Sequence, residues 1–516
     1  MQQVDDSRRQ VVPRWRPFRV AAQLRLLDSP GTSPSLEPAP GELEELVEDW
    51  RRHRSPFHAA NLVDAAVVLN RPEIAADAAQ FLLSEGRGGL IETDLARFVL
   101  GDGGETPLAT TPPDLSRQER YRRIAEARRS LRQQPWNPIL LVDLAREYSA
   151  LGQLQSAERA LVRAVMLAPD NRFVLRAASR FLLHAGRPDD AHRVLRRAPS
   201  TPRDPWLLAA EIVAADAGKR SSRWMKVARR MINDGGFEPR HTTELASAVG
   251  TVEHSHGNRP QVRRLFEHAL IEPTENTVAQ AAWISRHMPA FEVPEDSFSV
   301  PRAFEARAWE SAVEKRYREA VDLSWEWLRD EPFATRAASF GSAVASIALG
   351  DFEAGKALAS AARLANPDDP RLILQLIYCV ASQGDPDEAE RLLTEDLPVA
   401  IRRHPGRLPE NDHKIFEVAD RGLIAYRRGQ VQEGRLHYER AMTLAREAGS
   451  PTLEAGALLN FLREEALANP GSAIPWESAS ALLKAFPASV RPFYESFLER
   501  TRLFHRTGGF AQPPGR

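Results

Sequence analysis

The sequence predicts an all-α protein, built as a solenoid of stacked helical hairpins in two sub-arrays. Apolar residues recur at spacings of three and four residues in segment after segment, which is typical of amphipathic helices. Small residues return 34 residues apart, from Gly152 to Gly186 and from Ala157 to Ala191. Hydrophobic residues make up 43% of the 516-residue chain but aromatic residues only 7%, so alanine and leucine fill much of the predicted core. A fixed period of this length indicates a repeat architecture.

The clearest hairpin is predicted for Pro138–Asn171. Gly152 ends the first helix, where a left-handed backbone costs glycine least. Pro169 ends the second helix, because the residue before a proline avoids helical geometry. Ala145 and Ala157 are small, so the two helices can approach closely there. The apolar stripe of the first helix is formed by Leu141, Leu144 and Tyr148.

These residues resemble the 34-residue pattern of the tetratricopeptide-repeat family. The next unit keeps the phase of the pattern with Gly186 and Ala191, and later units repeat it from Gly350 to Gly384. The resemblance implies a right-handed superhelix whose concave groove is lined by the first helix of each hairpin. It also implies a non-catalytic scaffold or adaptor that binds a segment of a partner protein in that groove.

The family places groove residues at the second, fifth, ninth, twelfth and thirteenth positions of a repeat. Carried onto the units at 138–171 and 172–204, these positions include three arginines and a histidine, and arginine suits carboxylates and phosphates. The positions lack the Lys and Asn with which chaperone-binding members clamp a carboxylate. The later units present apolar residues there, which line the groove or contact the neighbouring repeat. The candidate partner-binding residues are Val142, Arg146, Arg176, Arg180, His184, Phe340, Val344 and Tyr378.

Composition shifts and proline-rich stretches suggest seven segments. The segment 1–40 is expected to be disordered, with Val20–Leu27 docking on the protein itself or on a partner. The segment 287–301 is expected to be a hinge between sub-arrays, or a loop lying across the protein's own groove. The segments are a Pro/Arg-rich arm at 1–40, degenerate hairpins at 41–100, a linker at 101–114, sub-array 1 at 115–286, the hinge at 287–301, sub-array 2 at 302–450, and capping helices with a tail at 451–516.

The sequence offers no recognisable catalytic, cofactor or metal motif. It has no Gly-rich phosphate loop, no His-Glu-x-x-His and no nucleophile elbow. Cys379 is the only cysteine and lies in an apolar stripe. The histidines at 241, 254 and 256 lack further ligands at a metal-binding spacing. We therefore expect no enzymatic activity, cofactor or metal, and, without a long apolar run, a soluble cytoplasmic protein.

A nucleic-acid-associated regulator is the alternative reading. The helix expected at 115–134 carries seven arginines between residues 117 and 132, and the groove arginines add to them. Against this reading, the formal net charge is only −1, and two glutamates dilute the helix. Arginine greatly outnumbers lysine along the chain, which indicates a GC-rich bacterial genome or a surface selected for arginine.

Overall fold

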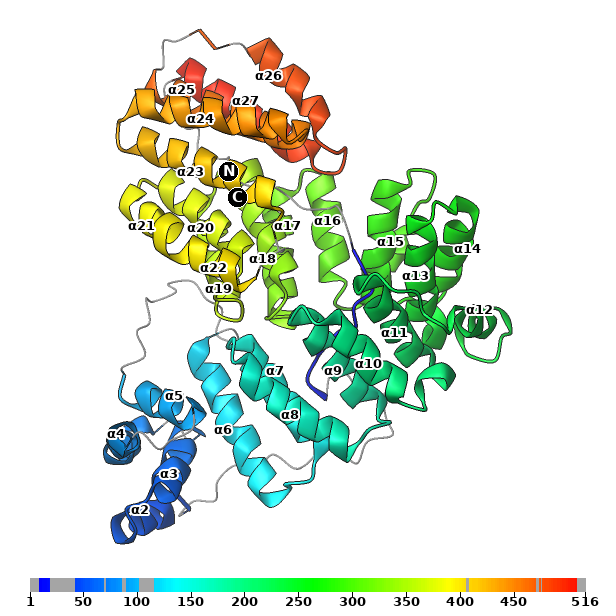
Figure 1. The fold of residues 1–516 in the computed structure, drawn as a ribbon, viewed down its shortest axis with the longest axis vertical. Coiled ribbons are helices and arrows are strands. Elements are labelled where there is room, and N and C mark those ends of the chain that lie inside the picture. Colours follow the sequence, from blue (N-terminus) through cyan, green and yellow to red (C-terminus); the bar gives the residue numbers. More distant parts are fainter. Residues whose placement is uncertain are drawn as a thin grey trace. The chain divides into compact units, whose positions relative to one another are not determined.

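The computed structural model describes residues 9–18, 42–68, 71–85, 90–101, 116–404, 408–469, 473–474 and 476–507. Within these ranges the regular structure is helical without strands, and consecutive helices pack against one another as hairpins (Figure 1). The predicted all-α solenoid of stacked hairpins is confirmed. The chain divides into two compact units, which we call the N-terminal unit (Val12–Ala228) and the C-terminal unit (Arg229–Arg516 together with the first residues up to Val11).

The N-terminal unit contains ten α-helices and two 3-10 turns in its described part, and its boundary falls within α12. Their bounds are α2 (Glu42–Arg52), α3 (Pro56–Val68), η2 (Pro72–Ala75), α4 (Ala76–Glu85), α5 (Leu90–Val99), α6 (Arg117–Gln133), α7 (Pro138–Ala150), α8 (Leu154–Leu167), α9 (Arg172–His184), α10 (Pro188–Arg197), η4 (Thr201–Arg203) and α11 (Pro205–Ala217), followed by α12 (Met225–Asn233) at the boundary.

The C-terminal unit continues the array of hairpins, with 3-10 or π turns where helices are interrupted. Its elements are α13 (Pro239–Ser255), α14 (Arg259–Ala269), α15 (Glu275–His287), η5 (Glu295–Ser299), α16 (Phe304–Val313), α17 (Tyr317–Asp330), α18 (Thr335–Ala343), η6 (Val344–Leu349), α19 (Phe352–Arg363), α20 (Pro370–Ser382), α21 (Pro386–Arg391), η7 (Leu392–Asp396), α22 (Leu397–Arg403), α23 (Glu410–Arg427), α24 (Val431–Glu447), α25 (Pro451–Ala468), α26 (Trp476–Leu482), η8 (Leu483–Ala485) and α27 (Arg491–Thr507).

The hairpin of α7 and α8 forms as its sequence predicts. Asn137 caps α7, because its side-chain oxygen accepts hydrogen bonds from the amides of residues 139 and 140 at 3.0 and 3.2 Å. Gly152 has a φ of 70° just after α7, a left-handed conformation that glycine adopts without strain. Ala145 and Ala157 are fully buried, as the close approach of the two helices requires. Gly186 repeats the same turn after α9, with a φ of 72°.

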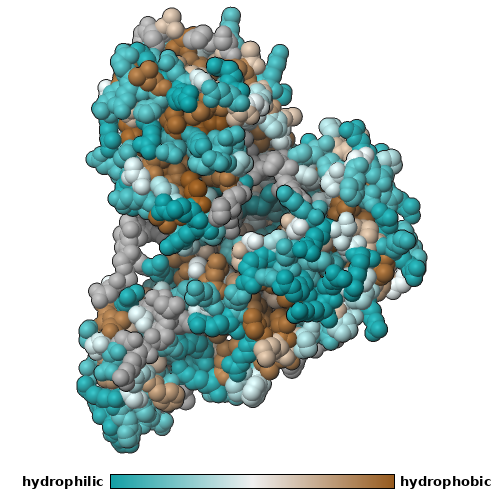
Figure 2. Space-filling view, in the orientation of Figure 1, coloured by the Kyte–Doolittle hydropathy of each residue, from teal (hydrophilic) through white to brown (hydrophobic). Residues whose placement is uncertain are grey.

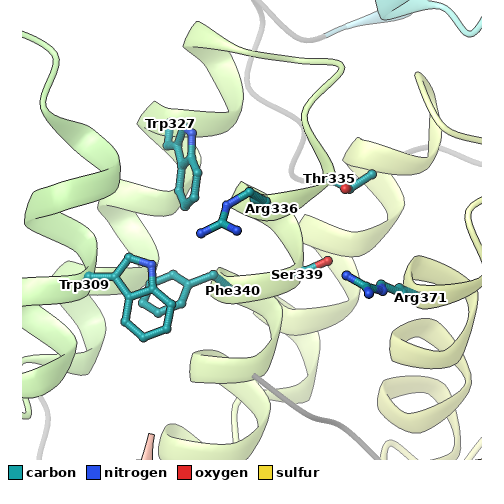
Figure 3. Close-up of a pocket in the computed structure, with 7 residues that line it drawn as sticks. All are labelled: Trp309, Trp327, Thr335, Arg336, Ser339, Phe340 and Arg371. Atoms are coloured by element: carbon teal, nitrogen blue, oxygen red, sulfur yellow. The ribbon is translucent and has the colours of Figure 1, made fainter. Parts of the chain in front are cut away.

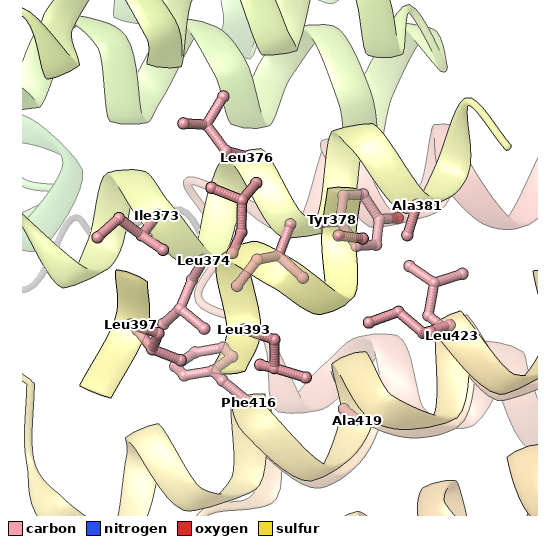
Figure 4. Packing of buried hydrophobic residues seen from close by; sticks show 14 of the residues in the cluster. Ile373, Leu374, Leu376, Tyr378, Ala381, Leu393, Leu397, Phe416, Ala419 and Leu423 are labelled. Carbon is pink, nitrogen blue, oxygen red and sulfur yellow. The ribbon is translucent and has the colours of Figure 1, made fainter. Parts of the chain in front are cut away.

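A hydrophobic cluster holds the later hairpins of the C-terminal unit together. Figure 4 shows Ile373 and Leu374 of α20 facing Leu397 and Phe416, and all four are buried. The short helix α22 adds Leu397 and Ala400 to this core. At roughly 25 cal/mol for each Å² of apolar surface buried, such a cluster is the main stabilising contribution between neighbouring repeats.

The Pro-rich segment at 287–301 does not mark the boundary between the two compact units. Phe291 is buried in a cluster with Phe266 and Trp283. Phe298 packs on a second cluster that joins α15 to the start of α16. These contacts place the segment inside the C-terminal unit, and the chain divides instead between Ala228 and Arg229. This corrects the expected position of the boundary, because aromatic residues between the prolines anchor the segment.

The N-terminal arm is ordered where the structure describes it. Residues 9–17 have no regular secondary structure, yet Arg9, Val11, Trp15 and Phe18 are buried. The expectation of disorder is therefore wrong for residues 9–18, since aromatic and arginine side chains give the segment enough contacts to offset the entropy of ordering it. The apolar stretch Val20–Leu27 and the predicted linker, apart from Gly101, lie outside the described residues.

The last helix, α27, packs on the unit rather than only capping its end. Phe493, Phe497 and Leu498 of α27 are buried, and the helix contacts η6 and α25. Arg500 donates hydrogen bonds to the carbonyl oxygens of Ile347, at 2.9 Å, and of Ala348. In the face of the molecule seen in Figure 2, hydrophilic residues dominate and hydrophobic residues form small patches between them.

Candidate peptide-binding surface

In each unit the first helices of the hairpins form one face, which we call the first-helix face. In the N-terminal unit it includes α7 and α9, which contact each other. In the C-terminal unit it includes α13, α15, α16, α18 and α20, and α15 contacts both α13 and α16. This is the face to which the tetratricopeptide pattern assigns the groove.

An extended segment of the chain itself, residues 12–18, lies on the first-helix face of the N-terminal unit. The ring of Phe18 meets that of Phe173 edge-on, with centroids 5.5 Å apart. The ring of Trp15 meets that of Phe181 in the same way at 6.4 Å. Trp15 is only 1% exposed, so this face of α9 buries nearly the whole indole. Two aromatic residues spaced three apart thus anchor the segment to α9.

Two polar side chains of α7 hold the backbone of the same segment. Arg146 Nε donates to the carbonyl oxygen of Trp15 at 2.9 Å. Asp143 Oδ1 accepts from the backbone N–H of Phe18 at 3.2 Å. Glu147 accepts from Arg146 at 3.1 Å and from Arg120 of α6 at 2.9 Å, which fixes the direction of the Arg146 guanidinium. Contacts of this kind are made to the peptide backbone, so segments of many different sequences can form them.

Burial of charged groups beside the segment shifts their pKa values. Loss of water around the carboxyl group raises the pKa of Asp143 to about 7, and the Phe18 N–H and the charge of Arg146 oppose this rise. Burial, with the like charge of Arg14 nearby, lowers the pKa of Arg180 to about 9. Both pKa shifts arise from the burial of charged groups on α7 and α9.

The structure divides the predicted groove residues of the N-terminal unit between two roles. Arg146 contacts the bound segment, and Val142 is buried one turn before it on α7. Arg176 instead joins α9 to α11, because it donates to the carbonyl oxygen of Trp206 at 3.2 Å and lies 4.9 Å from the centre of its indole ring. His184 is half-buried at the end of α9.

In the C-terminal unit, the predicted groove residues are covered by the chain's own last helices. Phe340 contacts Phe493 of α27, with ring centroids 6.4 Å apart, and Val344 is buried in η6. The Tyr378 hydroxyl donates to Asn460 at 2.9 Å and accepts from Arg463 at 2.8 Å, both on α25. These three positions are therefore buried within the unit, and whether they bind a partner stays a prediction.

A small pocket remains open on this side of the C-terminal unit. Figure 3 shows Arg336 and Arg371 flanking Ser339, with the indole of Trp309 close to the ring of Phe340. The ring centroids of Trp309 and Phe340 are 4.4 Å apart, and the Arg286 guanidinium lies 4.2 Å from the centre of the Trp309 ring. Guanidinium and hydroxyl groups at one opening offer hydrogen-bond donors to an acceptor group of a bound segment. The pocket is lined by Trp309, Trp327, Thr335, Arg336, Ser339, Phe340 and Arg371.

Beside this pocket, Arg9 is bound by side chains of α15 and α16. The Glu305 carboxylate accepts from Arg9 Nε at 2.8 Å and from Nη2 at 2.7 Å, a two-pronged ion pair. Gln280 Oε1 accepts from Nη1 at 2.7 Å, and Asn276 accepts from Nη1 through its carbonyl oxygen at 3.3 Å and from Nη2 through its side chain at 3.2 Å. Glu305, Gln280 and Asn276 were not predicted as site residues, because each lies in an ordinary helical pattern.

The described residues include the histidines and the cysteine considered in the sequence for other chemistry. Among them, no group of three or more His, Cys, Asp and Glu side chains is placed to hold a metal ion. His254 instead meets the ring of Trp283 at 5.5 Å. Cys379 is fully buried. No helix in the described ranges is long and apolar enough to cross a membrane.

Comparison with known proteins agrees with the repeat pattern. The tetratricopeptide-repeat family model matches residues 346–399, which span η6 to α22. The match shows a tetratricopeptide repeat at residues 346–399, in keeping with the hairpins and the 34-residue register found elsewhere in the chain. No curated protein matches the sequence.

Several solved structures align over most of the chain at low identity. Yeast Tom70 is 13% identical, with 75% of this chain and 93% of that chain covered and a TM-score of 0.32. The APC/C hetero-tetramer Cut9–Hcn1 is 11% identical, with coverage of 89% and 96% and a TM-score of 0.35. The human IFIT1 dimer with PPP-AAAA is 13% identical, with coverage of 83% and 99% and a TM-score of 0.23.

Proposed function

We propose that this protein is a non-catalytic interaction scaffold that binds an extended segment of a partner protein on its first-helix face. Tetratricopeptide repeats are in general modules for protein interaction, which supports this class of function. The observation that carries the proposal is the way residues 12–18 lie on α7 and α9. Arg146 and Asp143 bind their backbone, and aromatic contacts bind Trp15 and Phe18.

This observation supports the proposal because the face holds an extended segment of the chain itself. The segment has no regular secondary structure before Phe18, and its contacts are those that any extended peptide with suitably spaced aromatic residues can make. A partner segment of similar chemistry would gain the same contacts once the arm leaves. The cytoplasmic location remains a prediction.

The nucleic-acid alternative is less favoured, because most of the basic helix is neutralised within the protein. Carboxylates pair with at least five arginines of α6 at 2.5 to 3.0 Å. The pairs are Arg120 with Glu147, Arg122 and Arg123 with Glu119, Arg128 with Glu92, and Arg132 with Asp64. Asp64 and Glu147 are themselves buried, so the paired guanidinium groups are committed to holding α6 in place.

Affinity capture of the tagged full chain from its native host, with and without nuclease, tests the proposal. We expect a protein in near-stoichiometric amount that survives nuclease. The variant Arg146→Ala is expected to retain less of it, whereas Arg193→Ala, an exposed arginine on α10, is expected to retain it fully. Capture of nucleic acid, or of proteins that nuclease releases, would overturn the proposal in favour of the alternative.

A further inference from the structure

The Arg9 site has the geometry of a built arginine pocket. Five hydrogen bonds from Nε, Nη1 and Nη2 reach Glu305, Gln280 and Asn276, which matches the five N–H donors of a guanidinium group. Arg9 and Glu305 are each 5% exposed, so the ion pair is almost fully removed from water. A lysine ammonium has three donors and no planar fork, so it cannot reproduce this arrangement.

The acceptors of the pocket are oriented by the protein rather than by Arg9 alone. The Gln280 side-chain nitrogen donates to Thr251 of α13 at 2.9 Å, which turns the Gln280 oxygen toward the guanidinium. The Asn276 side-chain nitrogen lies 3.4 Å from Glu244 Oε1, which turns the Asn276 oxygen the same way. Arg336 Nη2 lies 3.4 Å from Glu305 Oε1 and adds a second positive charge beside that carboxylate. The pocket is therefore prepared for a guanidinium group.

The pocket also binds the backbone of its occupant, and its acidic surroundings favour a basic segment. Gln280 Nε2 donates to the carbonyl oxygen of Arg9 at 3.1 Å, a contact that any peptide can make. Glu244, Glu275 and Glu305 are buried on the successive helices α13, α15 and α16, which makes this stretch of the face acidic. Val11, two residues after the arginine, is 1% exposed and belongs to the same unit.

We propose that this pocket is a recognition site for an arginine side chain on an extended segment of a partner protein, and that Arg9 occupies it in cis. The segment would carry an arginine two residues before a branched apolar residue, as Arg9 and Val11 do. Because Arg9 is tethered, its effective concentration is high, and the partner must displace it. This inference rests on the proposed function and names the chemistry of the partner.

A labelled peptide with the sequence of residues 4–13 tests the proposal. It carries Arg9 and Val11 but neither Trp15 nor Phe18, so it probes only this pocket. We expect fluorescence anisotropy to detect binding to the full-length double variant Arg9→Ala/Val11→Ala. Affinity should fall at least about tenfold when the peptide carries Arg9→Lys, because an ammonium cannot make the five planar hydrogen bonds of the guanidinium. A similar fall is expected when Glu305→Gln is added to the protein, because the buried guanidinium then lacks its charged partner. Wild-type protein should bind more weakly than the double variant.

A folded double variant that binds no peptide would overturn the proposal and leave Arg9 as an intramolecular strap. Circular dichroism and the melting temperature establish whether the variant is folded. If it is not, wild-type protein decides by hydrogen exchange: excess peptide must speed exchange at residues 9–11, and unchanged exchange overturns the proposal. A nuclease-resistant partner in affinity capture, without peptide binding here, would leave the scaffold function standing and remove only the arginine pocket.

Discussion

Arg9 and Glu305 lie 296 residues apart in sequence and form a two-pronged ion pair of 2.8 and 2.7 Å inside the C-terminal unit. The pair joins the start of the N-terminal arm to α16, so residues 9–11 are part of the C-terminal unit. Buried ion pairs add little net stability over apolar packing, but breaking one leaves an uncompensated charge. We therefore expect a large loss of arm docking when only one of the two residues is replaced.

Glu305→Gln is expected to loosen the arm. The amide keeps the size of the side chain but removes the charge, so the guanidinium of Arg9 loses both charge-assisted bonds. Removing one partner of a buried pair costs about 3–5 kcal/mol. The measured loss of stability should be smaller, because the arm can undock locally. Hydrogen exchange at residues 9–11 should rise markedly. The exposed Glu292→Gln, which has no such pair, should leave exchange unchanged; equal protection in both variants would contradict the account.

Asp143→Asn is expected to change how stability depends on pH. The pKa of Asp143 is raised to about 7 in the folded protein from its usual 3.8, so the folded state keeps a proton that the unfolded chain has already lost. The contribution of this group to the stability of the fold is therefore complete at low pH. It decreases as the pH rises from about 4 to about 7, and it is constant above about pH 7. The amide of the variant does not titrate, and its oxygen still accepts from the Phe18 N–H.

The melting temperature of Asp143→Asn relative to wild type should accordingly rise between about pH 4 and about pH 7 and then stay constant. The groups that face this carboxyl are the Phe18 N–H, Arg146 and Glu147. The control Asp234→Asn, an exposed carboxylate at the end of α12, should show a flat difference. A difference that does not vary with pH in Asp143→Asn would show that the carboxyl is not held in its neutral form.

Trp15→Ala is expected to release the arm without unfolding the N-terminal unit. Truncating a buried tryptophan typically costs about 3–5 kcal/mol, but a terminal segment loses no more than its own docking free energy, since it can open locally. Limited proteolysis should cut residues 9–18 much faster, with a small change in melting temperature. Trp136→Ala, which removes a 73% exposed indole, should be cut at the wild-type rate. Slow cleavage in Trp15→Ala would mean that other contacts hold the arm.

Phe493→Ala is expected to detach α27 from the first-helix face of the C-terminal unit. The fully buried ring contacts Tyr317 and Phe340, with centroids 5.9 and 6.4 Å away, and its loss leaves a cavity costing about 3–5 kcal/mol. The melting temperature should fall, and a dye that binds apolar surface should bind more. Leu503→Ala on the same helix removes a side chain that is 45% exposed and should have little effect. Similar melting temperatures for both variants would argue against this role for α27.

The hairpins could be predicted from the sequence because the signals that form them are local. Gly152 and Gly186 mark the ends of helices, and the alanines between them mark where helices approach closely. Each of these signals lies within a 34-residue unit. The face on which a segment binds could also be predicted, since Arg146 is at a family groove position and contacts Trp15. The segment that occupies this face, residues 12–18, could not be predicted. The apolar run at 20–27 is the stronger local signal for docking, whereas the spacing of Trp15 and Phe18 suits an extended chain.

The arginine pocket could not be predicted, because it joins residues that no local pattern connects. Arg9 lies in a polar stretch, and Gln280 and Glu305 occupy positions where a solvated helix face is the ordinary expectation. The covering of Tyr378 by α25 is also long-range, with its partner Asn460 82 residues away. Arg176 was a groove candidate by its position, but the following repeat supplied Trp206 as its partner.

Hydrogen exchange of the full-length protein, alone and with the partner retained in affinity capture, tests the central claim most directly. We expect the partner to slow exchange along α7 and α9 and to speed it at residues 9–18, because the partner takes the place of the arm. Protection elsewhere on the molecule, with residues 9–18 unchanged, would contradict the claim that the first-helix face is the binding surface.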